Sequence, residues 1–192
     1  MKTKTRKLIL FMHVSLDGFV AGPKGEMNWI KVDEEIFDHV GQRVALSDTA
    51  LYGRVTYDMM EGYWPTAGDP PGASKHDREH SQWYKHAKKI VVSRSLKGAS
   101  RPNTQIISEN LSAEITAIKA VPGPDILIFG SPSASHALQK EKLIDGYWLF
   151  VNPTLLGEGV PLFASGNKAA LRLMQSHAFS NGVICLSYEN AG

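Results

Sequence analysis

Four short segments rich in glycine, serine or arginine stand where apolar, strand-like runs end. They are Gly53-Arg54-Val55-Thr56, Ser93-Arg94, Gly130-Ser131-Pro132-Ser133 and the turn from Pro153 to Phe163. Backbone N–H groups at the start of a helix bind phosphate, and so does an arginine guanidinium group. Taken alone, the Gly53 segment fits a structural turn equally well, and Ser93-Arg94 fits a solvated turn better. Together, at the carboxyl ends of strands where open α/β sheets bind ligands, they predict a site for a phosphate-bearing molecule.

The turn from Pro153 to Phe163 is the most informative of these segments. It carries two prolines and two glycines in an apolar stretch, and it follows the buried strand predicted at Tyr147–Val151. Proline fixes φ, whereas glycine permits positive φ or a close backbone approach. We therefore expect one defined irregular path that is neither helix nor strand.

A second irregular region is predicted from Tyr63 to His80, because five prolines and glycines fall between Pro65 and Gly72. Loops longer than about 12 to 15 residues are often functional lids. Tyr63 and Trp64 would then cover a substrate. The alternative is a flexible excursion without a role.

The end of this region matches the pattern H-x-x-E-H at His76, Glu79 and His80. On a helix, two such histidines could bind zinc with the glutamate as a base, which is the chemistry of a metalloprotease. We expect a solvated charged turn and no metal, because the segment adjoins a proline-rich loop, lacks an apolar helix face and has no clear third ligand downstream.

The elements that must position these groups alternate between strand and helix. Strands are predicted at Leu8–Val14, Thr49–Tyr52, Lys88–Val92, around Ile106, Asp125–Phe129 and Tyr147–Val151. Helices are predicted at Asp33–Leu46, Val55–Met60, Ser112–Ala120 with Ser112 as the cap, and Pro132–Leu143. Asn181-Gly182 is a strong hairpin signal between Leu171–Phe179 and Gly182–Glu189. The fold class is α/β, with a mostly parallel, helix-covered sheet and an antiparallel C-terminal hairpin.

The composition excludes several classes of protein. The 192 residues are 43% hydrophobic and 21% charged with a net charge of +2, and four basic residues lie in the first seven positions. No basic footprint for nucleic acid remains beyond these four, and no apolar run approaches the roughly 20 residues of a membrane helix. The single cysteine, Cys185, cannot form an internal disulfide. We expect one cytoplasmic domain over residues 1–192.

The motifs taken together resemble the dihydrofolate reductase-like fold. More narrowly, they resemble the reductase domain of the riboflavin-biosynthesis deaminase-reductase. The resemblance rests on Ser15–Gly22 after the first strand, Trp29 before an acidic helix, Gly53–Tyr57, Ile90–Arg94, and Leu143-Ile144-Asp145 leading to the Pro153 turn. The zinc-deaminase signature is absent from the sequence.

The resemblance implies NADPH binding across the carboxyl edge of the sheet. Hydride would pass to a C=N or C=O carbon of a small pterin-like or ribosylaminopyrimidine-like substrate. It assigns the cofactor to His13, Val20, Gly53, Arg54, Val55, Thr56, Ser93, Arg94, Gly130, Ser131 and Ser133, with Ser93 and Arg94 at the 2′-phosphate. It also implies a homodimer, which agrees with the aromatic and edge surface expected near the C-terminus.

The resemblance is less specific about the residues that bind the substrate and donate the proton. Trp29, Tyr63, Trp64 and Phe163 are the expected substrate contacts. Glu34 and Asp17 are the expected proton donors, although Glu34 also suits a helix N-terminus and Asp17 a turn. Ser131 and Pro132 stand where the family often has consecutive glycines. A non-catalytic nucleotide- or pterin-binding module is therefore the alternative function.

Overall fold

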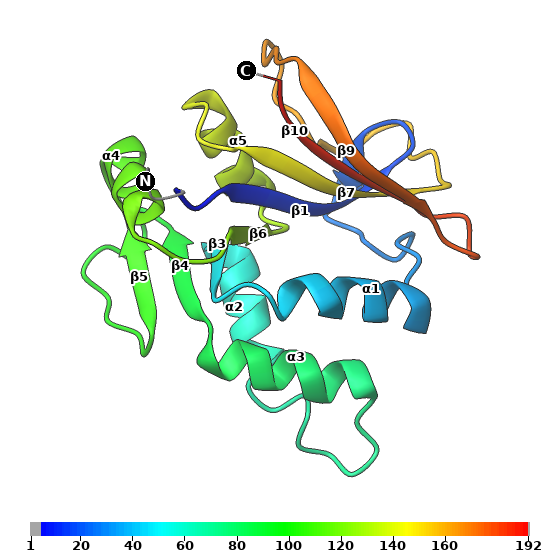
Figure 1. Ribbon diagram of the computed structural model, residues 1–192, viewed down its shortest axis with the longest axis horizontal. Helices are drawn as coiled ribbons and strands as arrows, with labels where there is room; N and C mark the ends of the chain where they lie inside the picture. The colour runs from blue at the N-terminus through cyan, green and yellow to red at the C-terminus, as the bar shows by residue number, and fades with distance from the viewer. Residues whose placement is uncertain (1–4, 192) are drawn as a thin grey trace.

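One eight-stranded sheet organises the protein, which we describe from a computed structural model covering residues 5–191 (Figure 1). The strand order is β5-β4-β3-β6-β1-β7-β10-β9, and the first six of these strands run parallel. The strands are β1 Leu8–Ser15, β3 Thr49–Gly53, β4 Lys88–Val92, β5 Thr104–Ile107, β6 Ile126–Phe129, β7 Gly146–Asn152, β9 Leu171–Ala178 and β10 Ile184–Asn190. The mostly parallel sheet with an antiparallel C-terminal hairpin is confirmed.

Helices cover both faces of this sheet, because the strand side chains alternate between two apolar clusters. Along β1, Leu8 and Leu10 face one cluster and Ile9 the other. On the second face lie α1 Glu34–Val44, α2 Arg54–Tyr63 and α3 Lys75–His86; on the first lie α4 Leu111–Ala120 and α5 Pro132–Lys140. The result is a three-layer α/β arrangement (Figure 1).

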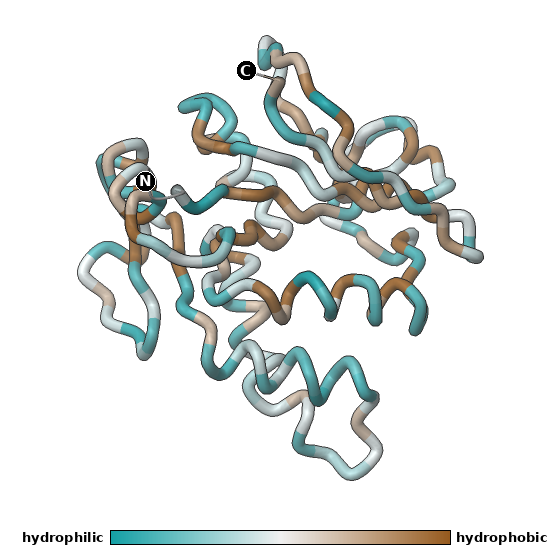
Figure 2. Tube along the Cα trace, in the orientation of Figure 1, coloured by the Kyte–Doolittle hydropathy of each residue, from teal (hydrophilic) through white to brown (hydrophobic). Residues whose placement is uncertain are grey.

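Helix α3 corrects the loop predicted at Tyr63–His80. The irregular chain ends at Ser74, whose hydroxyl accepts from the Asp77 N–H while the Asp77 carboxylate accepts from the Ser74 N–H, a complete capping box. The helix then continues to His86, and its buried residues are His80, Ser81 and Tyr84. Figure 2 shows α3 largely in teal. Its polar composition concealed the helix from a search for apolar periodicity.

Two smaller predictions about element boundaries are also wrong. Ser112 does not cap α4, because the helix begins at Leu111 and the N-cap is Asn110 in the left-handed conformation (φ 52°). The Pro153–Phe163 turn contains a short strand, β8 Val160–Pro161, which pairs antiparallel with β2 Phe19–Ala21. The approach is so close that a Cβ at Gly159 would lie 2.2 Å from the carbonyl oxygen of Ala21.

The C-terminal hairpin is tied to the start of α1. The Ser180 N–H and hydroxyl donate to Glu35, and the Asn181 amide donates to the Asp33 carboxylate at 2.6 Å. The outer strand β9 is exposed at every residue. This edge is the least covered part of the sheet, as its position at the rim of Figure 1 shows.

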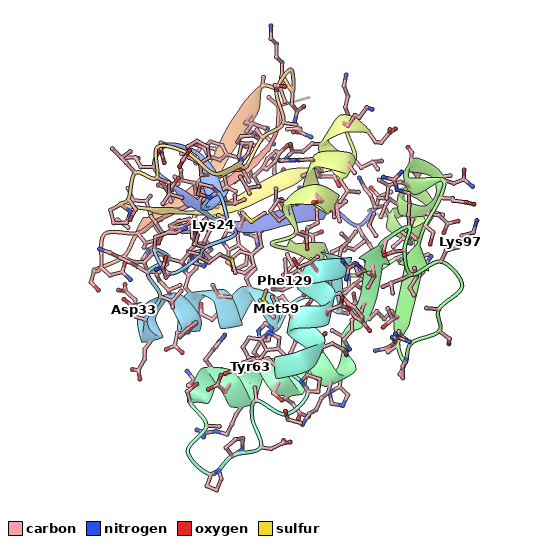
Figure 3. All side chains as sticks on the ribbon, turned by 180° about the vertical axis from the view of Figure 1, so that it is seen from behind. Lys24, Asp33, Met59, Tyr63, Lys97 and Phe129 are labelled. Carbon is pink, nitrogen blue, oxygen red and sulfur yellow. The ribbon has the colours of Figure 1, made fainter. Side chains whose placement is uncertain are left out.

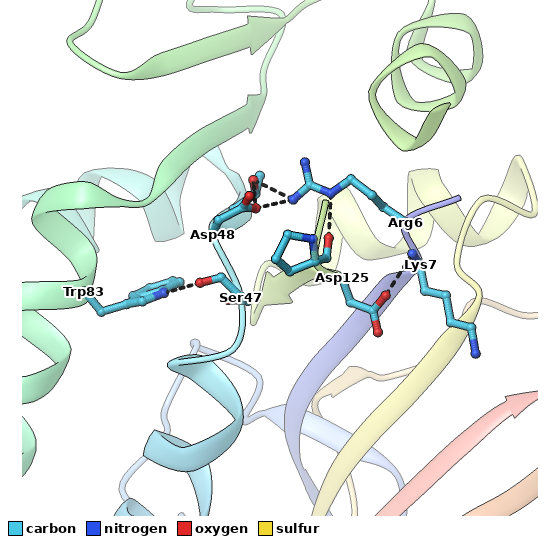
Figure 4. Close-up of polar contacts among 8 residues, drawn as sticks. Arg6, Lys7, Ser47, Asp48, Trp83 and Asp125 are labelled. Carbon is cyan, nitrogen blue, oxygen red and sulfur yellow. Dashed lines mark hydrogen bonds and ion pairs between the residues drawn. The ribbon is translucent and has the colours of Figure 1, made fainter. Parts of the chain in front are cut away.

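Polar contacts close the amino-terminal edge of the sheet (Figure 4). The buried Arg6 guanidinium pairs with Asp48 and donates to the Pro124 carbonyl and the Thr49 hydroxyl. Nearby, the Trp83 indole donates to the Ser47 carbonyl at 2.8 Å. This edge is therefore held by side chains, and the opposite edge is left for ligands. None of the helices in residues 5–191 has the length and apolar character needed to cross a bilayer.

Candidate functional site

A cleft of about 660 Å³ opens at the carboxyl ends of β3, β4, β5 and β6. We call it the edge cleft. Three of the predicted segments line it: Gly53–Thr56, Ser93-Arg94 and Ser131–Ser133. The chain from Ile107 to Leu111 and Val160 of β8 complete its walls. The structure thus brings together residues that are far apart in the sequence, as the four strand ends predicted.

Three helices begin at the edge cleft, and none of them has a side-chain cap. The N-cap residues are Gly53 for α2, Asn110 for α4 and Ser131 for α5. By contrast, α1 and α3 begin elsewhere and are capped by Asp33 and Ser74. The first N–H groups of a helix have no partner within the helix, and its dipole favours anions there. Three such ends in one cleft favour negative charge there.

Ser131 holds the floor of the edge cleft together. Its hydroxyl accepts from the Gly53 N–H at 2.9 Å and donates to the Phe129 carbonyl at 3.0 Å, so it joins the ends of β3 and β6. The packing at Gly53 is tight, because a Cβ there would lie 3.3 Å from the Ala134 Cβ. Pro132 occupies the first helical position, where its missing N–H would have no helical partner in any case. The floor is therefore formed without consecutive glycines.

The two arginines of the edge cleft, Arg54 and Arg94, differ in whether their guanidinium groups already form an ion pair. Arg54 pairs with Asp58 one turn along α2, at 3.0 Å. Arg94 is exposed, and within residues 5–191 no hydrogen bond or ion pair engages its guanidinium. The Ser93 hydroxyl, which is buried, accepts from the Leu96 N–H and shapes the turn that presents Arg94. A strongly charged ligand group at this end of the cleft would meet Arg94 first.

A second, smaller pocket of about 160 Å³ lies on the other face of the sheet, and we call it the aromatic pocket. Helix α2 runs between the two sites, with Thr56 at the edge cleft and Trp64 at the aromatic pocket, roughly 12 Å further along the helix axis. Gly130 stands between Phe129 of the pocket and Ser131 of the cleft. The pocket is lined by Phe11, His13, Val32, Ile36, Phe37, Val40, Met60, Trp64, His76, His80 and Phe129.

The histidines of the aromatic pocket are held uncharged. Burial lowers the pKa of His80 to about 3 and the pKa of His13 to about 4, and it also lowers the pKa of His76. The His80 ring centroid lies 4.0 Å from that of Trp64, and His76 stacks on Phe37 at 4.1 Å. At neutral pH these imidazoles are polar but neutral groups in an aromatic wall.

These positions also correct the solvated turn predicted for H-x-x-E-H. His76 and His80 lie on α3, and His80 is 8% exposed. No group of three or more His, Cys, Asp or Glu residues in the described part of the chain is arranged to bind a metal ion. The two histidines are built into the pocket wall, so the structure gives no support to the metalloprotease alternative.

Neither predicted proton donor lines the aromatic pocket. The Asp17 carboxylate accepts from the Ser15 hydroxyl at 2.6 Å and from the N–H groups of Leu156 and Gly157. These bonds, the Ser15 bond above all, lower the Asp17 pKa, so Asp17 anchors the Pro153–Phe163 turn as an anion. Glu34 is exposed in the first turn of α1.

The remaining predicted residues are dispersed. Of the expected substrate contacts only Trp64 reaches the aromatic pocket. The Trp29 indole donates to the Glu26 carbonyl, the exposed Tyr63 hydroxyl donates to Asp77, and Phe163 packs on Tyr147 on the opposite face. Of the expected cofactor contacts, Val20 is buried in the apolar core, and His13 lines the aromatic pocket and not the edge cleft. The sequence analysis missed Phe37, Met60, Asn110 and Phe129, and it weighed His76 and His80 only as metal ligands or solvated residues.

The sheet order and its covering helices define an α/β protein of the dihydrofolate reductase-like fold. The family of the RibD C-terminal domain matches residues 6–185, and the chain belongs to this family. The resemblance expected from the sequence is confirmed.

Three relatives show the range of this similarity. The chain is 32% identical over 190 residues to the uncharacterized protein YyaP of Bacillus subtilis (strain 168), covering 97% of this chain and 96% of YyaP. It is similar to the crystal structure of a putative riboflavin biosynthesis protein from Shewanella sp. PV-4, with a TM-score of 0.69, 21% identity and coverage of 97% and 99%. Dihydrofolate reductase from Enterococcus faecalis, complexed with NADP(H), shares the fold at a TM-score of 0.62, 12% identity and 97% coverage of both chains.

Proposed function

We propose that the protein is an NADPH-dependent reductase that acts on a C=N or C=O carbon of a small molecule. The observation that carries this proposal is the convergence in one cleft of three helix N-termini without side-chain caps and of Arg94, which has no partner within residues 5–191. A dinucleotide carries a diphosphate, which the helix N-termini would bind. NADPH adds a 2′-phosphate, which Arg94 would bind. Family membership supports the same class of reaction.

The residues present fit this cofactor. The starts of α2 and α5 would hold the diphosphate between Arg54 and Ser133, on the floor that Ser131 and Gly53 form. Arg94 would hold the 2′-phosphate. The absence of a side chain at Gly53 allows a ligand to approach the backbone of the floor closely. Bound nicotinamide supplies hydride; the chain supplies binding, orientation and exclusion of water.

The proton donor remains a proposal. Of the two expected acids, Asp17 is engaged by three donors, whereas no hydrogen bond within residues 5–191 engages the Glu34 carboxylate. We propose Glu34 as the donor; because it lies outside the aromatic pocket, its proton would reach the substrate through water. Glu34→Gln should lower kcat by about 10²- to 10⁴-fold if this carboxylate protonates the product. An unchanged kcat would assign the proton to solvent.

A second candidate function is a non-catalytic nucleotide-binding module on the same fold. It is favoured by the absence of any carboxylate among the described residues that line the aromatic pocket. Such a module would bind the nucleotide and leave it unoxidised.

Titration with NADPH and NADH by calorimetry tests both functions, followed by absorbance of the reduced nicotinamide against pterins, ribosylaminopyrimidines and small carbonyls. Binding with oxidation supports the reductase, and binding without oxidation against the whole panel supports the module. Failure to bind either nucleotide contradicts both.

A further inference from the structure

The aromatic pocket has the size of a single ring. Its volume is about 160 Å³, and an apolar protein cavity of about 150 Å³ holds one benzene molecule. Its walls come from β1, α1, α2, α3 and β6, and they include the aromatic rings of Phe37, Trp64 and Phe129. In Figure 3, Phe129 lies at the junction of α1 and α2, with Met59 and Tyr63 further along α2. A planar ligand fits such walls better than a bulky saturated one.

Two polar groups of this pocket, the imidazoles of His76 and His80, have no hydrogen-bond partner among the described residues. His80 is 8% exposed, and its ring nitrogens are not among the fully buried polar atoms, so they are open to water or to a ligand in the pocket. A ligand there can therefore supply a hydrogen-bond partner to an imidazole nitrogen. A neutral imidazole has one donor and one acceptor nitrogen, which suit a carbonyl oxygen or a ring nitrogen.

The pocket carries no charge that could hold an anion. No lysine, arginine, aspartate or glutamate is among the described residues that line it. Burial keeps His13 and His80 neutral at pH 7. A phosphate group placed here would lose its water without meeting a cation, which is strongly unfavourable. The cations suited to phosphate, Arg54 and Arg94, line the edge cleft instead.

We propose that the aromatic pocket is the substrate site and that the substrate is a small, uncharged, unphosphorylated planar compound with a conjugated carbonyl or imine. This inference rests on the proposed function, because the cofactor fills the edge cleft. It narrows the substrate class: ribosylaminopyrimidine phosphates are disfavoured, and single-ring carbonyl compounds are favoured. His80 is assigned as the hydrogen-bond partner of the substrate.

The test compares benzaldehyde with its phosphorylated counterpart, 4-formylphenyl phosphate. Both are titrated into the full-length protein while the histidine ring resonances are followed by NMR, a readout that needs no turnover. We expect benzaldehyde to shift the His80 resonances and to bind at least ten times more tightly than the phosphate ester. Equal or tighter binding of the ester, or no binding of either compound, would overturn the proposal.

Two variants sharpen the test. His80→Phe should weaken benzaldehyde binding by roughly three- to tenfold through loss of one hydrogen bond. His86→Phe, on the exposed side of the same helix, should not. Val32→Lys places a cation at the rim of the pocket, where Val32 is 46% exposed, and should raise the affinity for the ester about tenfold or more. No gain in Val32→Lys, or equal losses in both histidine variants, would contradict the assignment.

NADPH titration of the same samples separates this inference from the proposed function. Normal NADPH binding with no aldehyde binding would overturn the substrate class alone. Aldehyde binding in the pocket without any NADPH binding would overturn the reductase and leave the pocket assignment standing. Retained NADPH affinity in His80→Phe also shows that this variant is folded.

Discussion

Arg94 is the residue on which the choice between the two nicotinamide nucleotides depends. It is exposed at the edge cleft, and no partner within residues 5–191 competes for its guanidinium. A hydrogen bond to a charged group is worth about 1.5 to 3 kcal/mol, or roughly ten- to a hundredfold in affinity. We therefore expect the wild type to prefer NADPH, and Arg94→Ala to reduce the ratio of NADPH to NADH affinity by this factor in calorimetric titrations.

Arg54→Ala is the matched control for this measurement. Arg54 faces the part of the cleft where the helix starts converge, and the diphosphate expected there is common to both nucleotides. Its loss should weaken NADPH and NADH alike and leave their ratio unchanged. If Arg94→Ala leaves the ratio of NADPH to NADH affinity unchanged, Arg94 does not bind the 2′-phosphate.

His80 makes folding stability depend on pH. In the unfolded chain it takes up a proton near its ordinary pKa of 6.5, but burial lowers the folded pKa to about 3. The contribution of neutral His80 to the free energy of unfolding is therefore fully present above about pH 6.5. It decreases as the pH falls toward the pKa of the folded state, by up to roughly 1.4 kcal/mol per pH unit. Urea unfolding should show a loss of about 2 kcal/mol between about pH 7 and pH 5 from this residue.

The same experiment on two variants isolates the effect of His80. His80→Phe should flatten the pH dependence by that amount, whereas His86→Phe, which is exposed on the same helix, should keep the wild-type slope. An identical slope in wild type and His80→Phe would mean that His80 is protonated within the fold.

The role of an individual residue could be predicted from the sequence where its type is tied to one backbone conformation. Glycine at 53 and Ser131-Pro132 at a helix start mark a cleft floor from their types alone, and the structure brings them together. The pocket histidines were not predictable in this sense. Their i and i+4 spacing is visible in the sequence, but the same spacing suits zinc, solvent or a buried wall. Only the packing of α3 beside Phe37 and Trp64 decides between these.

At the scale of elements, the strands were predicted best because burial on both faces makes them continuous apolar runs. Helix α3 was missed because the residues it buries are His80, Ser81 and Tyr84, with no aliphatic repeat. Its start was nevertheless encoded, since Ser74 and Asp77 have the spacing of a capping box. The cap of α4 was misplaced because Asn110 adopts a left-handed conformation that composition does not reveal.

The capping box of α3 should therefore be a measurable source of stability. Ser74→Ala removes the acceptor for the Asp77 N–H, and the expected loss in the free energy of unfolding is about 1 kcal/mol. Hydrogen exchange should quicken in the first turn of α3, beside His76. Ser112→Ala, in a helix that Ser112 does not cap, should leave stability within about 0.5 kcal/mol. Equal effects in both variants would contradict the capping assignment.

At the scale of the whole molecule, the C-terminal side of the sheet carries an uncovered apolar surface. Leu171, Leu173, Met174 and Ile184 are 36 to 50% exposed on the β9–β10 hairpin. Strand β9 is also the edge of the sheet, and exposed edges pair readily with another chain. We propose that two copies of the chain associate through this hairpin as a homodimer.

Sedimentation of two leucine variants tests the dimer. Leu173→Arg places a charge in the proposed interface and should shift the protein to a monomeric mass at micromolar concentration. Leu46→Arg, at the end of α1 where the leucine is 76% exposed, should remain dimeric. A wild-type protein that sediments as a monomer would refute the proposal and leave the hairpin as an ordinary exposed edge.

The uncapped helix starts at Gly53, Asn110 and Ser131 have a consequence for the life of the protein in the cell. Each missing cap forgoes about 1 kcal/mol of folding stability, which a bound anion can restore. A ligand at a hundred times its Kd adds about 2.7 kcal/mol by mass action. Inorganic pyrophosphate alone should thus raise the melting temperature. Because proteases remove unfolded chains, we expect the cellular abundance of this protein to follow the supply of its nucleotide.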